Sequence, residues 1–268
     1  MLRQPRPLVP FTFERRVADP LGAAGFKILL DARHSETLFK DTGGTTPVTS
    51  DGDAVALWKD RSGSGNDFQQ STGTRQPAYK TNVVNGLSVV RFNSSTVLGA
   101  ISAALGLTNN IASITMMALL AYPDAASVHT AFAANAGASG VRSRIGDGAT
   151  SGEYGVGGRR LDADSFVDVP GGTFTSGFVV QTSVLDYANA DAVLRINGTQ
   201  VAHSSSFQTA GNTSATNSVS ILVGAQGSVS SPAQSFGGDM VVLAVAVPKL
   251  DSTTLASVEA YLKSIAGL

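Results

Sequence analysis

The segment Val193-Leu-Arg-Ile-Asn-Gly-Thr-Gln-Val201 decides the fold class, because it carries the clearest hairpin signal in the chain. Its Asn197-Gly198 pair supplies the two positive-φ positions of a type I′ turn, and apolar residues flank the pair on both sides. We therefore expect antiparallel strands over Val193–Ile196 and Gln200–His203. A β-hairpin this late in the chain predicts an antiparallel β architecture around it.

Runs of strand-like residues bounded by turn clusters continue outward from this hairpin. They are Phe26–Leu30, Val55–Lys59, Leu87–Phe92, Ala112–Tyr122, Thr130–Ala134, Phe178–Leu185, Ser220–Val223 and Met240–Val247. The last of these is almost wholly apolar, whereas a sandwich strand with one wet face should alternate. Its outer face must be covered, and an amphipathic helix over residues 251–266 supplies the cover, with Asp251 or Ser252 as N-cap.

The composition agrees with one large all-β unit. Of the 268 residues, 43% are hydrophobic, 15% are charged and 29 are glycine, which is typical of many short strands joined by tight turns. The net charge of −1 gives no global field for nucleic acid or an anionic membrane, so we expect neither as a partner. The absence of cysteine excludes disulfides, thiol catalysis and Cys-ligated metal. The longest apolar run, residues 111–122, is too short for a spanning helix.

Residues 1–22 differ from the rest of the chain. Their prolines favour an extended backbone that cannot complete a sheet ladder. The prolines also interrupt the start of the chain, so it lacks the continuous apolar region of a signal peptide. We predict an attachment arm that lies along another protein, followed by a single domain over residues 23–268. The side chains expected to bind the partner are Arg3, Arg6, Phe11, Phe13, Arg15 and Arg16.

The stretch from Asp31 to Asn66 adds a family resemblance. Thr37-Leu-Phe-Lys-Asp-Thr-Gly-Gly-Thr-Thr-Pro-Val-Thr-Ser-Asp-Gly-Asp53 and Trp58-Lys-Asp-Arg-Ser-Gly-Ser-Gly-Asn66 together resemble the opening of laminin-G-like, concanavalin-like β-sandwich modules, which occur in proteins of tailed bacteriophages and prophages. The late hairpin and the ending at residues 258–268 also resemble these modules. The resemblance covers about residues 27–268, although residues 95–175 carry no recognisable motif. It implies an antiparallel jelly-roll-like β-sandwich and a place in a virion.

Two groups of charged residues are candidate sites. Arg142, Arg144, Arg159 and Arg160 form the strongest internal basic cluster. The cluster could meet an anionic sugar, nucleic acid or a partner's carboxylates, but solvation at the surface is favoured, because exposed arginines are ordinary. Asp31, Asp41, Asp51, Asp53 and Asp60 could supply oxygen ligands to calcium, which some relatives of this fold bind. The spacing is not that of an EF-hand, so turn and capping roles are favoured, and Asp51, Asp53 and Asp60 remain weak calcium candidates.

No catalytic constellation stands out in the sequence. The four glutamates, Glu14, Glu36, Glu153 and Glu259, form no pair at alternating strand positions, as a glycosidase on this fold would need. The histidines His34, His129 and His203 show no metal-ligand spacing. Trp58 could stack on a sugar, but its apolar neighbours favour the core.

The leading hypothesis is therefore a non-enzymatic structural protein of a bacteriophage particle, held by its arm and displaying a lectin-like sandwich in the capsid, neck or tail fibre. Its partners would be other virion proteins and copies of itself, no cofactor is expected, and assembly would take place in the bacterial cytoplasm. The alternative is an adhesion module that binds bacterial surface glycans. A third hypothesis is a polysaccharide-degrading enzyme.

Overall fold

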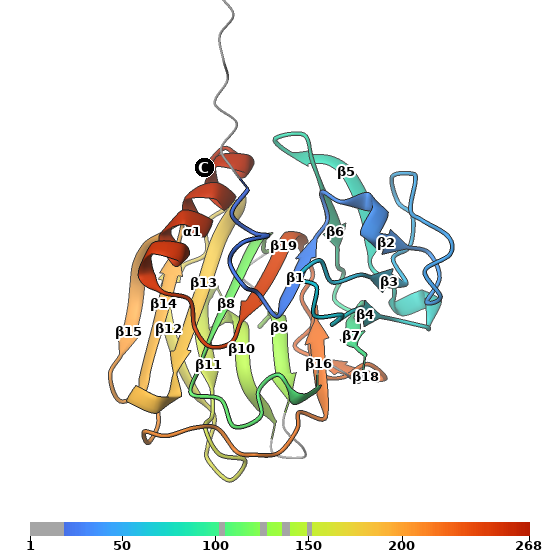
Figure 1. Cartoon of the computed structure of the whole chain (residues 1–268). Coiled ribbons are helices and arrows are strands. Elements are labelled where there is room, and N and C mark those ends of the chain that lie inside the picture. The colour runs from blue at the N-terminus through green and yellow to red at the C-terminus, as the bar shows by residue number, and fades with distance from the viewer. Residues whose placement is uncertain (1–18, 102–104, 124–127, 136–139, 149–151) are drawn as a thin grey trace, which may run out of the picture.

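A computed structural model of the protein shows two antiparallel β-sheets packed face to face, with a C-terminal helix on one outer face (Figure 1). The structure describes residues 19–268 except 102–104, 124–127, 136–139 and 149–151. The all-β sandwich predicted from the sequence is confirmed. No helix in the described part of the chain is both long and apolar enough to span a membrane.

The first sheet has eight strands and lies next to the helix. In spatial order these are β15 (Thr199–Ser204), β14 (Asp191–Ile196), β13 (Phe178–Asp186), β8 (Ser113–Ala121), β19 (Asp239–Ala246), β6 (Leu87–Arg91) and β5 (Ala78–Val84), with β1 (Ile28–Asp31) paired to β19.

The second sheet has nine strands, and a small hairpin lies beside it. The strand order is β12 (Val167–Thr173), β11 (Glu153–Gly158), β10 (Val141–Asp147), β9 (Thr130–Asn135), β16 (Ser220–Val223), β7 (Leu98–Ala100), β4 (Phe68–Gln69), β3 (Leu57–Trp58) and β2 (Leu38–Phe39). The hairpin consists of β17 (Gln226–Ser228) and β18 (Ser231–Ala233).

The turn that set the fold class has the expected geometry. Asn197 and Gly198 have φ values of 51° and 81°, so both central residues are in the left-handed region that a type I′ turn requires. Ile196 pairs with Thr199 across the turn, and β14 and β15 continue as an antiparallel pair. The predicted hairpin is confirmed.

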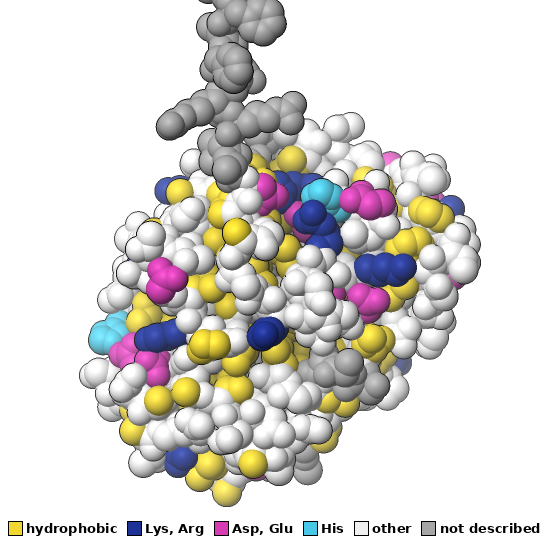
Figure 2. Space-filling model, in the orientation of Figure 1, with side chains coloured by type: hydrophobic (Ala, Val, Ile, Leu, Met, Phe, Trp, Pro, Cys, Tyr) yellow, Lys and Arg dark blue, Asp and Glu magenta, His cyan; other side chains and the backbone are white. Residues whose placement is uncertain are grey.

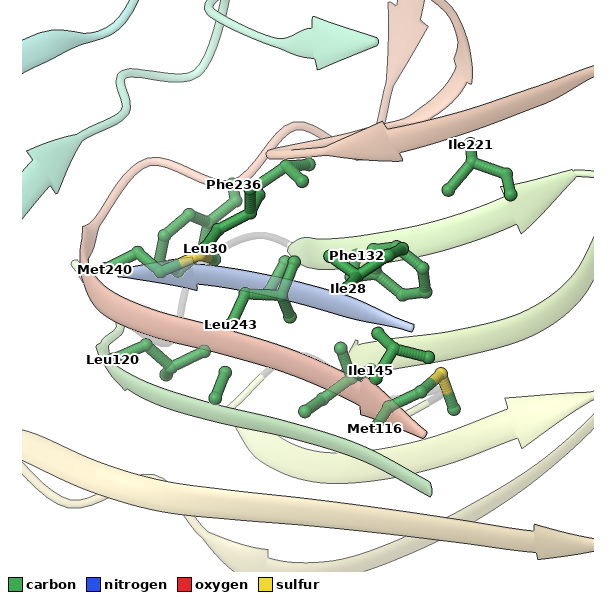
Figure 3. Close-up of a cluster of buried hydrophobic side chains, with 14 of the residues drawn as sticks. Ile28, Leu30, Met116, Leu120, Phe132, Ile145, Ile221, Phe236, Met240 and Leu243 are labelled. Atoms are coloured by element: carbon green, nitrogen blue, oxygen red, sulfur yellow. The ribbon is translucent and has the colours of Figure 1, made fainter. Parts of the chain in front are cut away.

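The main core fills the space between the two sheets. Figure 3 shows side chains of both sheets meeting there, with Met116 and Leu243 from the first sheet and Phe132, Ile145 and Ile221 from the second. All five are fully buried. Trp58 also belongs to this core and is completely buried, which confirms its predicted packing role.

The second core lies between the first sheet and helix α1 (Ser252–Ala266). In β19, Val241, Ala244 and Ala246 face this core, and Val258 and Leu262 of the helix pack onto them. The Asp251 side chain accepts hydrogen bonds from the backbone N–H groups of the first helical turn and acts as the N-cap. The helix predicted to cover the apolar strand is confirmed.

The start of the described chain also packs on this helix side. Leu21 and Phe26 are buried in the second core, and Asp19 lies 3.6 Å from the Arg33 guanidinium. The folded unit therefore includes Leu21, which was assigned to the arm. Figure 2 shows acidic, basic and histidine side chains gathered near the top of this face. The six residues of the arm that were predicted to bind a partner lie outside the described residues.

Four strands that the sequence did not predict lie in the segment without recognisable motifs: β7, β10, β11 and β12. Two of them have sequences that are typical of turns or exposed segments, because they are rich in arginine and glycine. Strand β10 is Val-Arg-Ser-Arg-Ile-Gly-Asp and β11 is Glu-Tyr-Gly-Val-Gly-Gly. Both strands are nevertheless almost entirely buried, because loops and neighbouring side chains cover their outward face. Charged and glycine residues there conceal the alternation on which strand prediction depends.

Candidate functional site

The four clustered arginines do not act as one group. Arg142, Arg144 and Arg159 are buried, so the expectation that they are solvated at the surface is wrong for these three. Arg160 is half-buried and donates a 3.3 Å hydrogen bond to the Asn212 carbonyl oxygen. Burial lowers the pKa of Arg159, although the negative charge of the nearby Asp162 acts to raise it.

Arg142 joins three loops. Its guanidinium donates to the carbonyl oxygens of Thr108 and Thr216 at 3.0 and 2.8 Å, and to Asp162 Oδ1 at 2.6 Å. It also donates to the Thr216 hydroxyl at 2.8 Å. With its donors directed at the protein itself, Arg142 stabilises the loops and does not present its charge to a ligand.

Arg144 lies on the outer face of the nine-stranded sheet, in a different setting. Its neighbour Ile145 points into the main core, so alternation along β10 directs Arg144 outward. By the same rule Val167 and Val169 of β12 face the core, and Asp168 faces outward beside Arg144. The sheet therefore brings together a cation and an anion that are 24 positions apart in the sequence.

The Arg144 guanidinium is held from three sides. It donates to Asp168 Oδ2 at 3.1 Å, to the Asp147 carbonyl oxygen at 2.9 Å and to the Gln234 side-chain oxygen at 3.1 Å. Its carbon Cζ also lies 5.0 Å from the centre of the Phe166 ring, in a cation–π contact. The guanidinium is thus fixed in place, which leaves its neighbours in a defined arrangement.

Phe166 owes its position to a glycine. A Cβ atom on Gly157 would come within 2.4 Å of the Phe166 ring and 2.7 Å of Asp168 Oδ1. Only the bare backbone of β11 lets the ring and the carboxylate settle onto the sheet at this point. Phe166 remains 38% exposed, one of four large apolar side chains in the described chain with that much exposure.

One oxygen of the Asp168 carboxylate is buried without a hydrogen-bond partner. Its side chain is only 8% exposed, and Oδ1 has no hydrogen-bond partner. Burial raises the pKa of Asp168 above its ordinary value, although the Arg144 guanidinium opposes this shift. A buried acceptor without a donor is unfavourable unless a bound group or water supplies one.

These residues surround a hollow of about 540 Å³ on the outer face of the sheet. Its lining consists of Val128, Arg144, Gly148, Phe166, Val167, Asp168 and Gln234. A concave surface with an aromatic ring and a few convergent polar groups is the usual form of a small-ligand site. Of the four arginine candidates, only Arg144 belongs to it, and the sequence did not single out Phe166, Asp168 or Gln234.

The calcium candidates lie apart from this hollow and serve local turns. Asp51 accepts hydrogen bonds from Lys80 and from the Thr81 backbone N–H, and Asp53 accepts from the backbone N–H groups of residues 49 and 50. Asp60 accepts from the backbone of residues 29, 62 and 66. Within the described ranges, no three acidic, histidine or cysteine side chains gather in a group that could hold a metal ion. The predicted turn role is confirmed for Asp53 and Asp60, whereas Asp51 instead ties its turn to residues 80 and 81 of β5.

Comparison with known proteins supports the fold but does not establish a family. No family model matches the sequence, and no curated protein matches it. Among solved structures, a GH54 α-L-arabinofuranosidase has a TM-score of 0.62 at 13% identity, covering 93% of this chain and 66% of the other. The binding domain of Paraclostridial Mosquitocidal Protein 1 has a TM-score of 0.59 at 13% identity, covering 90% and 52%.

Two further structures extend this range. The binding domain of botulinum neurotoxin serotype G has a TM-score of 0.59 at 11% identity, covering 89% of this chain and 51% of the other. Trypanosoma rangeli sialidase has a TM-score of 0.54 at 11% identity, covering 92% and 34%. This chain thus spans about half the length of the toxin binding domains and a third of the sialidase. The protein shares a lectin-like β-sandwich fold with both binding domains and enzymes.

Proposed function

We propose that the protein is a non-enzymatic, lectin-like module that binds a bacterial surface glycan and is displayed on a bacteriophage particle. The observation that carries the binding role is the hollow formed by Arg144, Asp168 and Phe166. It combines an exposed aromatic ring, a buried acceptor oxygen without a donor and a guanidinium held in place. Toxin binding domains with the same fold add support at the level of architecture.

The chemistry of this hollow suits a sugar. The C–H face of a pyranose ring is apolar enough to pack on Phe166, while its hydroxyl groups can form hydrogen bonds with the exposed Gln234 side chain. The Arg144 guanidinium lies against both residues and neutralises the carboxylate. Because the pair carries no net charge, a neutral saccharide fits better than an anionic one.

A hydrolytic role is disfavoured by the carboxylates present. Glycosidases of the usual kind place two carboxyl groups on either side of the scissile bond. Among the described residues that line this hollow, Asp168 is the only carboxylate, and its Oδ2 accepts the Arg144 hydrogen bond. Binding without cleavage is the function that this arrangement supports.

The proposed display also has a geometric basis. Asp19, where the predicted arm joins the sandwich, contacts Arg33, and Arg33 donates to the Tyr261 hydroxyl of α1 at 2.8 Å. The junction therefore lies on the helix side of the first sheet, and the hollow lies on the outer face of the second sheet. An arm anchored from the helix side would leave the hollow directed away from the particle. The bacteriophage setting itself rests on the family resemblance of the sequence.

Glycan binding is tested with an array of bacterial O-antigen, capsular and cell-wall polysaccharides. We expect selective binding, and a loss of about tenfold or more on Phe166→Ala, which corresponds to about 1.4 kcal/mol. Val201→Ala is the matched control, because Val201 is also 38% exposed but belongs to β15 of the other sheet. An array without any bound saccharide, or equal binding by Phe166→Ala and Val201→Ala proteins, would rule the proposal out.

Display is tested by deleting residues 1–18. This deletion retains Leu21 in the second core and Asp19 on Arg33, so the sandwich should fold as before. We expect the shortened protein to bind glycan normally and to be lost from purified phage particles. Full incorporation of the shortened protein would contradict the attachment role of the arm and leave the binding role intact.

A further inference from the structure

Three more hollows continue from the Phe166 site across the nine-stranded sheet. The first, of about 240 Å³, shares Arg144, Phe166 and Gln234 with that site. The next, of about 410 Å³, shares Gly140, Val141 and Gln226 with the first. The last, of about 510 Å³, shares Val219 and Ser228 with its neighbour. Consecutive hollows share lining residues, so the four lie side by side in one row on this face of the sheet, which we call the groove.

The groove is long compared with a single sugar ring. It begins at β12, which carries Asp168, and reaches β4, which precedes the lining residues Gln70 and Ser71. Six strand-to-strand intervals separate β12 from β4 in the sheet order. At about 4.8 Å for each interval, the groove crosses roughly 29 Å of sheet. It runs across the strands, so successive strands supply successive contact positions.

The last two hollows, of about 410 and 510 Å³, are lined mainly by uncharged side chains with hydroxyl and amide groups. These side chains are Gln70, Ser71, Thr72, Asn135, Ser220, Gln226, Ser228, Ser230 and Ser231. Of the described residues that line these two hollows, only Arg75 is charged, and its Nη1 donates to the Val229 carbonyl oxygen at 3.0 Å. Such a surface offers donors and acceptors along its length without selecting for a charged ligand.

An exposed apolar side chain marks the passage between the last two hollows. Val219 lines both of them and is 60% exposed, the highest value among the large apolar residues in the described ranges. Two of the four exposed large apolar side chains, Phe166 and Val219, therefore lie in the groove. Exposed apolar groups rimmed by polar ones are typical of binding surfaces. They give the groove two separate packing positions for a ligand.

The hairpin β17–β18 forms a fixed wall of the groove. The Gly227 carbonyl oxygen accepts from the Ser220 hydroxyl at 2.6 Å, and the Gly227 N–H donates to Asn135 Oδ1 at 3.4 Å. Val229 at the hairpin tip occupies the space that a Cβ on Gly99 would need, with its Cγ2 2.1 Å from that position. Held at these points, the hairpin keeps the groove open in the absence of ligand.

From this row of adjacent hollows we propose that the protein recognises the interior of an extended, neutral polysaccharide chain, and not a terminal sugar. This inference rests on the proposed glycan-binding function and names its ligand class. The Phe166 hollow holds one sugar unit, and neighbouring units of the same chain lie along the groove past Val219 to the hollow beside Ser230 and Arg75. Affinity should therefore rise with chain length.

The experiment compares fragments of one polysaccharide, graded by length from the monosaccharide upward, by calorimetry. The probes are O-antigen and capsular polysaccharides and their hydrolysis fragments. In the unaltered protein, longer fragments should bind at least tenfold more tightly than the monosaccharide. Ser230 is exposed at the tip of the hairpin, and Ser230→Trp should fill the far hollow. It should remove the part of the gain made by fragments long enough to reach that hollow, without weakening the monosaccharide. Phe166→Ala should weaken every fragment.

The outcomes separate the two proposals. Equal affinity for all fragment lengths, or a Ser230→Trp protein that binds the longest fragments as tightly as the unaltered protein does, overturns the extended-chain inference while the glycan-binding function stands. Weaker monosaccharide binding by Ser230→Trp also overturns it, because the far hollow would then not be a separate position. Failure of every fragment to bind removes the proposed function itself. Unaltered unfolding temperatures verify that both variants are folded.

Discussion

Replacing Arg142 with alanine removes a cation that is completely buried and joins three loops. The guanidinium makes five hydrogen bonds, to Thr108, Asp162 and Thr216. Alanine leaves two carbonyl oxygens and one carboxylate without these donors in the space between the loops. Loss of one partner from a buried ion pair typically destabilises a protein by about 3–5 kcal/mol.

The lower end of that range applies here. The Asp162 side chain is 35% exposed and can regain hydrogen bonds from water once the guanidinium is gone. We therefore expect the free energy of unfolding to fall by about 3 kcal/mol. For a chain of this size that corresponds to a decrease of about 6–12 °C in Tm. Arg142→Lys should recover less than half of the loss, because an ammonium group cannot reproduce the planar fork of donors.

Urea and thermal unfolding followed by circular dichroism measure this effect. Arg160→Ala is the matched control, because Arg160 belongs to the same sequence cluster but is half-exposed and makes one 3.3 Å hydrogen bond. Its replacement should change the free energy of unfolding by about 0.5 kcal/mol or less. Equal losses for the Arg142→Ala and Arg160→Ala proteins would refute the assignment of Arg142 as the group that holds the loops.

Three further predictions concern stability. Gly158→Ala places a Cβ 2.2 Å from a backbone carbonyl oxygen of β10 and should lower the free energy of unfolding by about 1–3 kcal/mol in urea titrations. Gly86→Ala is not a suitable control, because the positive φ of Gly86 would itself strain an alanine. Burial alone would raise the pKa of Asp186, but the hydrogen bonds from Lys249 and Asn189 together with the Lys249 charge outweigh it and hold that pKa below 3.8. The resulting stabilisation is present above pH 3.8 and is lost as the pH falls through the folded-state value, so Asp186→Asn should flatten the acid limb of a Tm-against-pH curve. Glu259→Ala removes the carboxylate that lies 2.9 Å from the Arg195 guanidinium. We expect the free energy of unfolding to fall by about 2–3 kcal/mol in thermal unfolding. An unchanged Tm would contradict a role for this pair in docking α1.

Local patterns in the sequence were sufficient for much of the fold. Asn197-Gly198 fixed a turn because few residues adopt positive φ at two adjacent positions. The apolar strand Asp239–Ala246 required cover on both faces, and the helix that begins after Asp251 supplied it. These predictions succeeded because each depends on residues close together in the chain.

The second half of the groove-bearing sheet could not be predicted in this way. Strands β10 and β11 carry arginines and glycines at outward positions that loops cover, so their alternation of apolar and polar residues is weak. The arginine cluster was recognised, but its members were assigned to solvent. Burial of Arg142 depends on three loops that arrive from distant parts of the sequence.

The candidate site shows the same division. Arg144 was noticed because it lies near other arginines, whereas Asp168 and Phe166 lie in a polar segment without any motif. A glycine at position 157 that accommodates an aromatic ring has no signal in a single sequence. Only the pairing of β10, β11 and β12 places these side chains together.

The sequence by itself determined that this protein is an antiparallel β-sandwich with a covering C-terminal helix, since turn geometry and apolar periodicity are local properties. The tertiary structure alone decided which charges are buried, which face carries a hollow, and that Asp168 meets Arg144 beneath Phe166. The physical reason is that sheet register and loop packing bring together residues whose separation in the chain carries no information about their distance in space.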